Sequence, residues 1–231
     1  MKPHVICHMV ASVDGRTLIS RWQPADAHKI GLFDRLHGLL GGDAWLVGRV
    51  TGQEYAKGHT YPVDADQSYP REPWFARRAV TAYGIVLDAH GKIAWGRSDI
   101  GDDPIVAVLT KKVSDAHLAG LRQDGVSYIF AGEQELDLRL ALEILNRELG
   151  IKRLLLEGGG VTNGAFLRAG LIDEVSLAIF PAADGIRGAP CVFDSRDEEA
   201  SAPVPLRSMM LESNQVLEGG VVWLRYRLQS E

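Results

Sequence analysis

Two carboxylates follow segments that are typical of buried strands, a position suited to proton transfer. Asp14 comes shortly after the apolar run Val5–Ala11, and Glu157 ends the run KRLLLE. Burial beside a ligand raises the pKa of a carboxyl group and lets it donate a proton near neutral pH. Both residues can instead be structural, because Asp stabilises turns and Glu accepts backbone N–H bonds. The sequence leaves the two interpretations open.

Three consecutive glycines, Gly158, Gly159 and Gly160, follow Glu157 and precede an expected helix. Glycine permits close backbone approach, and the unpaired N–H groups at the start of a helix can bind an anion. The alternative is a tight turn. The spacing GGGVTNG is not the dinucleotide fingerprint G-x-G-x-x-G, which also normally lies in the first βα unit of a chain. Any phosphate site here is therefore of another kind.

Two other strand ends offer anion contacts. In GRVT, Gly48 and Thr51 can open a helix with a hydroxyl cap near a phosphate. In LTKK, Thr110, Lys111 and Lys112 could hold a 2′-phosphate and favour NADP over NAD. An ordinary capped turn and a pair of solvated lysines are the alternatives.

The segment HVICH invites a metal interpretation, but the sequence argues against one. On a strand, Cys7 points away from His4 and His8, and two histidines are too few ligands. No C-x-x-C, H-E-x-x-H or G-x-S-x-G pattern occurs. We expect no metal and no nucleophile elbow.

These residues need a scaffold, and the hydrophobic pattern predicts one. Short apolar runs alternate with helical patterns, which is typical of a mainly parallel α/β sheet flanked by helices. The last segment alternates Trp223, Arg225 and Arg227 with Leu224, Tyr226 and Leu228, which predicts a half-exposed antiparallel strand at the C-terminal end. The other predicted strands are Val5–Ala11, Ala44–Val47, 83–88, 104–110, 126–132, 152–157 and 174–180.

Helix patterns and glycine stops complete the scaffold. The predicted helices are 26–40, stopped by Gly41 and Gly42; 114–122, capped by Ser114 and ended by Gly125; 138–149, stopped by Gly150; and 163–169, ended by Gly170. The stretch 53–79 has no period and is rich in Tyr, Pro, Asp and Arg, so we expect a long loop that is either functional or a mobile surface insertion.

Ligands of such sheets gather beyond the carboxyl ends of the strands. The candidate site residues are therefore those at the predicted strand ends: 11–16, 48–51, 110–112, Gly132 and 157–163.

Composition favours a soluble, cytoplasmic protein with one domain over residues 1–231. Of its 231 residues 46% are hydrophobic, and the net charge of −5 gives no general attraction to nucleic acid or to an acidic membrane. Cys7 and Cys191 are the only cysteines, which is typical of a reducing compartment. No stretch reaches the roughly 20 apolar residues that span a bilayer, and the first residues do not match a signal peptide. We expect a small-molecule substrate as the partner.

Several segments, taken together and in order, resemble one known family. They are ASVDGRT, DAWLVGRVT, GIVLDAHGKI and LLLEGGGVTNGAFLRAGLIDEVSLAIFPAADG. The chain resembles the reductase domain of bifunctional riboflavin-biosynthesis deaminase-reductases, which share the dihydrofolate reductase fold. The resemblance implies an NADPH-dependent reductase, usually a homodimer, that transfers hydride to the ribosylamino group of a pyrimidine 5′-phosphate.

The resemblance also implies roles for single residues. Glu157 would face the substrate, and Arg16 takes the place of a basic residue in the turn. Val10 and Ala11 would line the nicotinamide. The contacts with NADPH would be Thr51, Gly159, Gly160, Val161, Thr162 and Asn163, running on to Ala165. To these the strand ends add Asp14 and Glu157 as candidate catalytic carboxylates, Asp14 and Arg16 as substrate contacts, and Gly48, Arg49, Thr110, Lys111, Gly132 and Gly158 as cofactor contacts.

The chain departs from the family pattern on the phosphosugar side. The helix before DAWLVG lacks the expected arginine, the segment after GRVT differs, and Ala89 replaces a small hydroxyl residue. Our first hypothesis is therefore an NADPH-dependent reductase of a small heterocyclic, imine or carbonyl substrate. The alternatives are the riboflavin-pathway reductase itself, with Arg71, Arg77 or Arg78 contacting phosphate, and a non-catalytic nucleotide-binding module.

Overall fold

A computed structural model describes residues 1–25, 31–62, 67–195 and 203–230. It divides into two compact units, the first formed by Met1–Pro3 and Asp43–Leu154 and the second by His4–Gly42 and Leu155–Glu231. The chain passes from the first unit to the second within strand β7 (Arg153–Leu156). Most of these strand pairs are parallel, and apart from one short antiparallel pair within residues 99–104 the antiparallel pairs lie near the C-terminus, so the predicted mixed α/β class is confirmed.

In the first unit the strands run in the order β4-β5-β3-β2, and β6 also pairs with β5. Strands β2, β3, β5 and β6 are parallel, and nearly all their residues are buried, as expected for apolar runs covered on both faces. Parallel pairing places the ends of these strands at one edge. The elements are β2 (Ala44–Gly48), α2 (Arg49–Tyr55), β3 (Tyr83–Leu87), β4 (Asp99–Ile100), β5 (Asp103–Leu109), α3 (Asp115–Asp124), β6 (Ser127–Phe130) and α4 (Leu138–Leu149).

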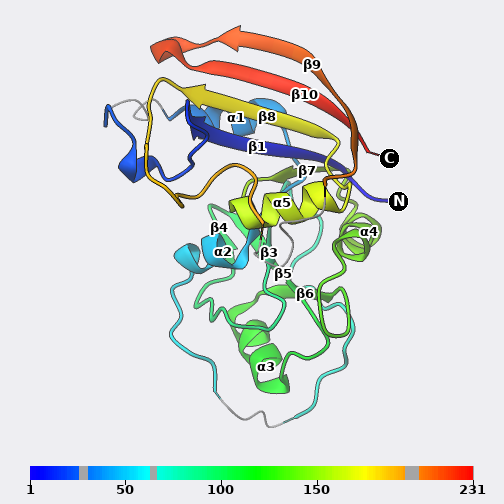
Figure 1. Cartoon of the computed structure of the whole chain (residues 1–231). Helices are drawn as coiled ribbons and strands as arrows, with labels where there is room; N and C mark the ends of the chain where they lie inside the picture. Colours follow the sequence, from blue (N-terminus) through cyan, green and yellow to red (C-terminus); the bar gives the residue numbers. More distant parts are fainter. Residues whose placement is uncertain (26–30, 63–66, 196–202, 231) are drawn as a thin grey trace. The chain divides into compact units, whose positions relative to one another are not determined.

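In the second unit the strands run in the order β1-β8-β10-β9, side by side in Figure 1. β1 and β8 are parallel and in register from Ile6 opposite Glu174 to Ser12 opposite Phe180. β10 is antiparallel to both β8 and β9. The elements are β1 (His4–Ser12), α1 (Leu32–Leu40), α5 (Gly160–Arg168), β8 (Glu174–Phe180), β9 (Leu206–Val216) and β10 (Val222–Ser230), with short 3₁₀ turns at Ile19–Arg21 and Glu218–Gly220.

The predicted helix signals act as expected in the first unit. The Ser114 side chain accepts the His117 N–H, and Gly125 ends α3 in the left-handed conformation. Gly150 ends α4 in the same way. None of the described helices is long and apolar enough to cross a membrane.

Three predictions about the elements were wrong in part. Helix α5 begins at Gly160 rather than Asn163, and α2 extends through Tyr55 into the stretch predicted as loop. Helix α1 is described from Leu32, after Gly31 in the left-handed conformation, and residues 26–30 of the predicted helix lie outside the described residues.

The alternation predicted for β10 also fails. Trp223 and Leu228, five residues apart, are both buried, and Arg225 is half-buried because its Nε donates to Glu174 at 2.5 Å. β10 lies between two strands, and its register with β9 shifts between Arg225 and Tyr226, so a simple two-residue period cannot hold. β9 itself was not predicted, because most of its residues are exposed and no core-facing period marks it.

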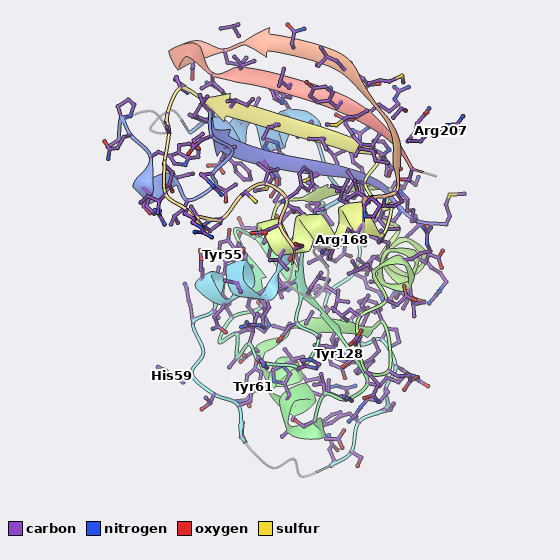
Figure 2. All side chains as sticks on the ribbon, viewed as in Figure 1. Tyr55, His59, Tyr61, Tyr128, Arg168 and Arg207 are labelled. Atoms are coloured by element: carbon purple, nitrogen blue, oxygen red, sulfur yellow. The ribbon has the colours of Figure 1, made fainter. Side chains whose placement is uncertain are left out.

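The described part of the long loop is packed rather than mobile. The Tyr61 hydroxyl donates to Asp124 Oδ2 at 2.7 Å and accepts the Trp95 N–H at 3.0 Å. Its ring covers Gly120, where a Cβ atom would lie 2.3 Å from the ring. Further along, the Trp74 backbone pairs with Tyr128. Tyr61 and Tyr128 are labelled beside α3 in Figure 2. Residues 63–66 lie outside the described residues.

The start of α5 packs closely against the segment that follows β8. A Cβ atom on Gly160 would lie 2.2 Å from the Cys191 carbonyl oxygen, and one on Gly164 would lie 1.8 Å from that of Asp194. The Asp194 N–H also donates to the Gly160 carbonyl at 2.9 Å. The two glycines, four residues apart on one helix face, therefore allow backbone to lie directly on the helix.

Tyr61→Phe tests the anchor of the loop. The substitution removes the hydroxyl that satisfies the Trp95 N–H and donates to Asp124, so we expect a loss of about 1–3 kcal/mol in the free energy of unfolding, measured by urea denaturation. Tyr69→Phe is the matched control on the same loop, since its hydroxyl accepts only an exposed bond from Gln67 among the described contacts. Equal losses in the two variants would contradict the assignment of the anchor to Tyr61.

Gly164→Ala tests the packing of α5. Its Cβ would overlap the Asp194 carbonyl, so we expect destabilisation of roughly 1–3 kcal/mol from overpacking, seen as a lower melting temperature. Gly38→Ala is the control: it is also helical and has nothing within 4 Å of the added Cβ. That change should stabilise the protein by about 0.5–1 kcal/mol. A Gly164→Ala protein as stable as Gly38→Ala would show that the close approach does not exist.

Candidate functional site

Asp14 fastens the loop after β1 to the loop after β8. Its Oδ1 accepts the Ser12 hydroxyl at 2.5 Å and the Asp184 N–H at 3.2 Å, and its Oδ2 accepts the Gly185 N–H at 2.8 Å. The turn is closed by Gly15, which has a positive φ of 77° and donates its N–H to the Ser12 carbonyl. These bonds match the structural interpretation of Asp14.

The expectation of a raised pKa at Asp14 was wrong. The residue is exposed, and the Ser12 hydroxyl, followed by the Gly185 N–H, lowers the pKa of its carboxyl to about 2. Three donors stabilise the charged form, so Asp14 holds no proton to donate near neutral pH.

The neighbouring residues of β1 and its loop mostly make contacts within the protein. Val10 and Ala11 are buried opposite Ala178 and Ile179 of β8. The Arg16 guanidinium donates to the Ala189 carbonyl at 2.8 Å, and its Nε is buried without a hydrogen-bond partner among the described residues. Arg16 thus supports the segment after β8, and its predicted contact with substrate stays a prediction.

Glu157, in contrast, has the environment expected of a proton-holding carboxyl. Its side chain is 7% exposed, and its Oε1 lies 2.7 Å from His37 Nδ1 on α1. Burial raises the pKa of Glu157, and the hydrogen bond from His37 opposes that shift only in part. The predicted raised pKa is confirmed in direction at this residue.

The glycines after Glu157 occupy different structural positions. Gly159 is the N-cap of α5 with a φ of 66°, which favours glycine, while Gly160 faces the Cys191 carbonyl. Gly159 and Val161 are exposed, so the first N–H groups of the helix lie on an accessible side. Gly158 is buried and Thr162 is half-buried. The start of α5 can therefore receive an anion on one side while the other side is packed.

Asn163 lies fully buried one turn into α5. Its Nδ2 donates to the Val192 carbonyl at 2.9 Å, and its Oδ1 has no hydrogen-bond partner among the described residues. An acceptor without a partner is costly in a protein interior, and a donor on a bound ligand would relieve that cost.

In the first unit, the GRVT segment forms the start of α2. Gly48 is the N-cap and makes no side-chain cap bond, so Thr51 is the third helical residue. The expected hydroxyl cap was therefore wrong. Gly52 lies against β3, where an added Cβ would be 2.5 Å from Val86 Cγ1. Arg49, the first helical residue, is exposed.

The ends of β5 and β6 meet through Thr110, Lys111 and Gly132. The Thr110 hydroxyl is buried and donates to the Ala89 carbonyl at 2.7 Å, and the Lys111 N–H donates to the Gly132 carbonyl at 3.0 Å. Lys111 Nζ pairs with Glu133 at 2.5 Å, an exposed contact that weakens its attraction for a phosphate. The Thr110 hydroxyl has a structural role, and Lys111 remains accessible.

The three arginines considered as phosphate ligands have protein partners. Arg71 binds Asp115, Arg77 binds Asp99, and Arg78 binds Glu148. Arg71 also donates to three backbone carbonyls, which makes it a clamp for the loop. These contacts do not favour a phosphate site at the three guanidinium groups.

The sequence analysis missed His37 entirely. A signal was available, because His37 lies four residues after Phe33 and beside the buried Leu36, so a polar group had to point near the apolar face of α1. Its partner lies 120 residues away, which no spacing rule reveals. Among the described residues no group of three or more His, Cys, Asp or Glu side chains could hold a metal ion.

Asp14→Asn tests the fastening of the two loops. An amide nitrogen in place of one oxygen would face the N–H donors, so the variant should melt at a lower temperature at pH 7. Because the pKa of Asp14 in the folded protein is about 2, below its ordinary value of 3.8, its contribution is present above pH 3.8 and lost as the pH falls through 2. The difference in melting temperature between wild type and Asp14→Asn should therefore disappear over that range. Asp102→Asn, at an exposed turn, is the control, and a gap that persists below pH 2 would contradict the assignment.

Comparison with known proteins finds relatives of this chain. The model of the RibD C-terminal domain matches residues 3–222. The 2,5-diamino-6-ribosylamino-4(3H)-pyrimidinone 5′-phosphate reductase of Methanothermobacter thermautotrophicus is 38% identical over 101 residues, which cover 43% of this chain and 46% of that protein. The protein of the same name from Archaeoglobus fulgidus is 24% identical over 110 residues, 48% of this chain and 50% of its own length. The matched region is thus about half of each relative.

Solved structures with the same fold cover nearly the whole chain. A pyrimidine reductase-like protein from Corynebacterium diphtheriae has a TM-score of 0.70 at 16% identity and covers 99% of this chain and 93% of its own. The riboflavin biosynthesis reductase Rib7 from Saccharomyces cerevisiae has a TM-score of 0.62 at 19% identity, covering 99% and 90%. At such identities they show the fold alone. The match over residues 3–222 shows more: this chain belongs to the RibD C-terminal domain family.

Proposed function

We propose that this protein is an NADPH-dependent reductase that converts a ribosylamino-pyrimidine 5′-phosphate to its ribitylamino form. The observation that carries the proposal is the family match over residues 3–222, together with curated relatives named as the pyrimidinone 5′-phosphate reductase. These findings favour the riboflavin-pathway alternative over our first hypothesis of an unspecified small heterocycle.

The start of α5 fits the diphosphate of a dinucleotide. Helix N-termini bind anions through unpaired N–H groups and the positive end of the helix dipole. The exposed Gly159 and Val161 leave room on that side, while Asn163 Oδ1 can accept a hydrogen bond from a hydroxyl or amide group elsewhere on the dinucleotide. We propose Gly158–Asn163 as the cofactor-binding segment of the second unit, with Val10 and Ala11 beside the nicotinamide.

For the first unit we keep the predicted cofactor residues as proposals. Arg49 and Thr51 lie at the start of α2, and Thr110, Lys111 and Gly132 lie together at the strand ends. The Lys111 ammonium group at these strand ends could bind a 2′-phosphate, which would have to compete with the Glu133 carboxylate for it. The homodimer, the cytoplasmic location and the single-domain organisation also stay predictions.

The chemistry of the proposal needs a hydride and a proton. Reduced nicotinamide supplies the hydride when it is bound. Glu157 is the proposed proton donor, because it is buried and burial raises the pKa of its carboxyl above the ordinary value. Asp14, whose pKa is lowered, instead keeps the loops after β1 and β8 together.

The direct test is an NADPH oxidation assay with purified protein. The substrates are 2,5-diamino-6-ribosylamino-4(3H)-pyrimidinone 5′-phosphate, 5-amino-6-(5-phosphoribosylamino)uracil, and a panel of pteridines and simple imines. We expect turnover with at least one of the two phosphoribosyl compounds and a ribitylamino product by mass spectrometry. Turnover of the panel alone would restore our first hypothesis, and NADPH binding without any turnover would favour the non-catalytic module.

A further inference from the structure

His37 and Glu157 form a pair in which the carboxyl is buried and the imidazole is half-buried. His37 Nδ1 lies 2.7 Å from Glu157 Oε1, within the range of a short charge-assisted hydrogen bond. His37 comes from the last turn of α1, and Glu157 directly follows β7, at the strand end where ligands of such sheets bind. The pair therefore connects a helix of the second unit to the proposed proton donor.

The two partners differ in their access to solvent. The Glu157 side chain is 7% exposed, whereas that of His37 is 34% exposed. A proton lost from Glu157 can therefore be replaced through the imidazole, which has contact with water. The carboxyl itself is largely screened from bulk solvent.

Among the described residues, the other titratable groups that act on the pair come from β1 and from α1. On β1, burial raises the pKa of Cys7 and lowers that of His8 to about 4, so both are neutral near pH 7. On α1, the charge of Asp34 raises the pKa of Glu157 further. His37 is thus the group among these that favours the charged form of Glu157.

Burial keeps His8 neutral, and its hydrogen bonds fix its tautomer. Its Nδ1 lies 3.1 Å from the Ser176 hydroxyl, which also accepts the Trp223 N–H at 2.9 Å, and its Nε2 lies 3.4 Å from the Phe33 carbonyl. The carbonyl fixes the hydrogen on Nε2, and the Ser176 hydroxyl can then donate to Nδ1. His8 stacks on Phe33 with ring centroids 4.7 Å apart and so supports the helix that carries His37.

We infer that His37 is a positioning residue of the reductase: it binds Glu157 Oε1 and thereby directs Oε2, with its proton, toward the nitrogen of the substrate. This inference rests on the proposed function. Hydride from the reduced nicotinamide forms a bond to the imine carbon of the opened ribosylamine, and the C=N π electrons move to nitrogen. That nitrogen takes the proton from Glu157 Oε2. The nicotinamide would be oxidised and the imine carbon reduced. His37 then gives its Nδ1 proton to Glu157 Oε1 and takes a proton from solvent, and rotation of the carboxyl brings the new proton to the substrate side.

If the His37–Glu157 pair were purely structural, replacing His37 would have different effects from those expected of a positioning residue. Replacing a structural partner of a buried carboxyl lowers stability, and it lowers activity by the same factor at every pH. A positioning residue that also carries charge changes the pH range in which Glu157 keeps its proton. The pH profile therefore separates the two roles.

The test compares His37→Asn and His37→Ala with wild type in the NADPH oxidation assay. Asn can donate an amide N–H from near the position of Nδ1, but it cannot carry a charge, while Ala does neither. We expect His37→Ala to lose about tenfold or more in kcat, as a fraction of the 10²–10⁴-fold that a positioned acid supplies. His37→Asn should recover most of that loss. The Michaelis constant for NADPH should change little in both variants.

In both variants the alkaline limb of the kcat profile should move to higher pH, because His37 lowers the pKa of Glu157 and its removal lets that pKa rise. Glu157→Gln should abolish the limb. His4→Asn, at the exposed first residue of β1, is the matched control and should leave kcat and the profile unchanged. If His37→Ala does not fold, the profile of His37→Asn carries the test.

The outcomes separate the two proposals. A wild-type protein that reduces neither phosphoribosyl pyrimidine overturns the proposed function, and the role of His37 in that reaction with it. An active wild type whose His37→Ala and His37→Asn variants keep the wild-type kcat and pH profile overturns the inference alone. Equal losses at all pH values in both variants would show that the pair is structural only and would also overturn it.

Discussion

The structure of the second unit depends on how closely backbone can approach helix α5. Gly160 and Gly164 present no side chain to the segment after β8, and the Cys191 and Asp194 carbonyls occupy the space that a Cβ would need. The Asp194 N–H bond to the Gly160 carbonyl and the Arg168 Nη1 bond to the Asp194 carbonyl, 3.2 Å long, hold that approach in place. Arg168 is labelled on α5 in Figure 2. One face of the helix is thereby fixed, and its first N–H groups stay accessible on the other.

Much of the fold follows from the hydrophobic pattern alone. Apolar runs such as Ala44–Val47 predict buried parallel strands because both faces are covered, and glycines such as Gly125 and Gly150 end helices because the left-handed conformation costs them little. The start of α5 was misplaced because a glycine-rich run has low helix propensity, and tertiary packing on 191–194 overrides it. β9 could not be predicted from the hydrophobic pattern, because most of its residues are exposed and none marks a face toward the core.

At the candidate site, too, some features follow from the sequence pattern and others from tertiary contacts. Strand ends made Asp14 and Glu157 candidates for contact with a ligand, yet their opposite environments depend on groups far away in sequence. Three N–H and O–H donors keep Asp14 charged, while desolvation favours the neutral form of Glu157. The donors to Asp14 include residues 184 and 185, and the partner of Glu157 is residue 37. Position along a strand can be predicted from sequence, but the electrostatic environment of a carboxyl requires the tertiary structure.

The fastening at Asp14 also has a mechanical consequence. A single exposed carboxylate joins two loops that are 170 residues apart in sequence, through bonds to the backbone rather than to side chains. Residues 184 and 185 are themselves constrained, because the buried Asp184 side chain accepts a bond from Arg21 at 2.9 Å and Gly185 has a positive φ of 70°. The two loops are thus joined at both Asp14 and Arg21, so that the loss of one carboxylate contact leaves a second joint in place.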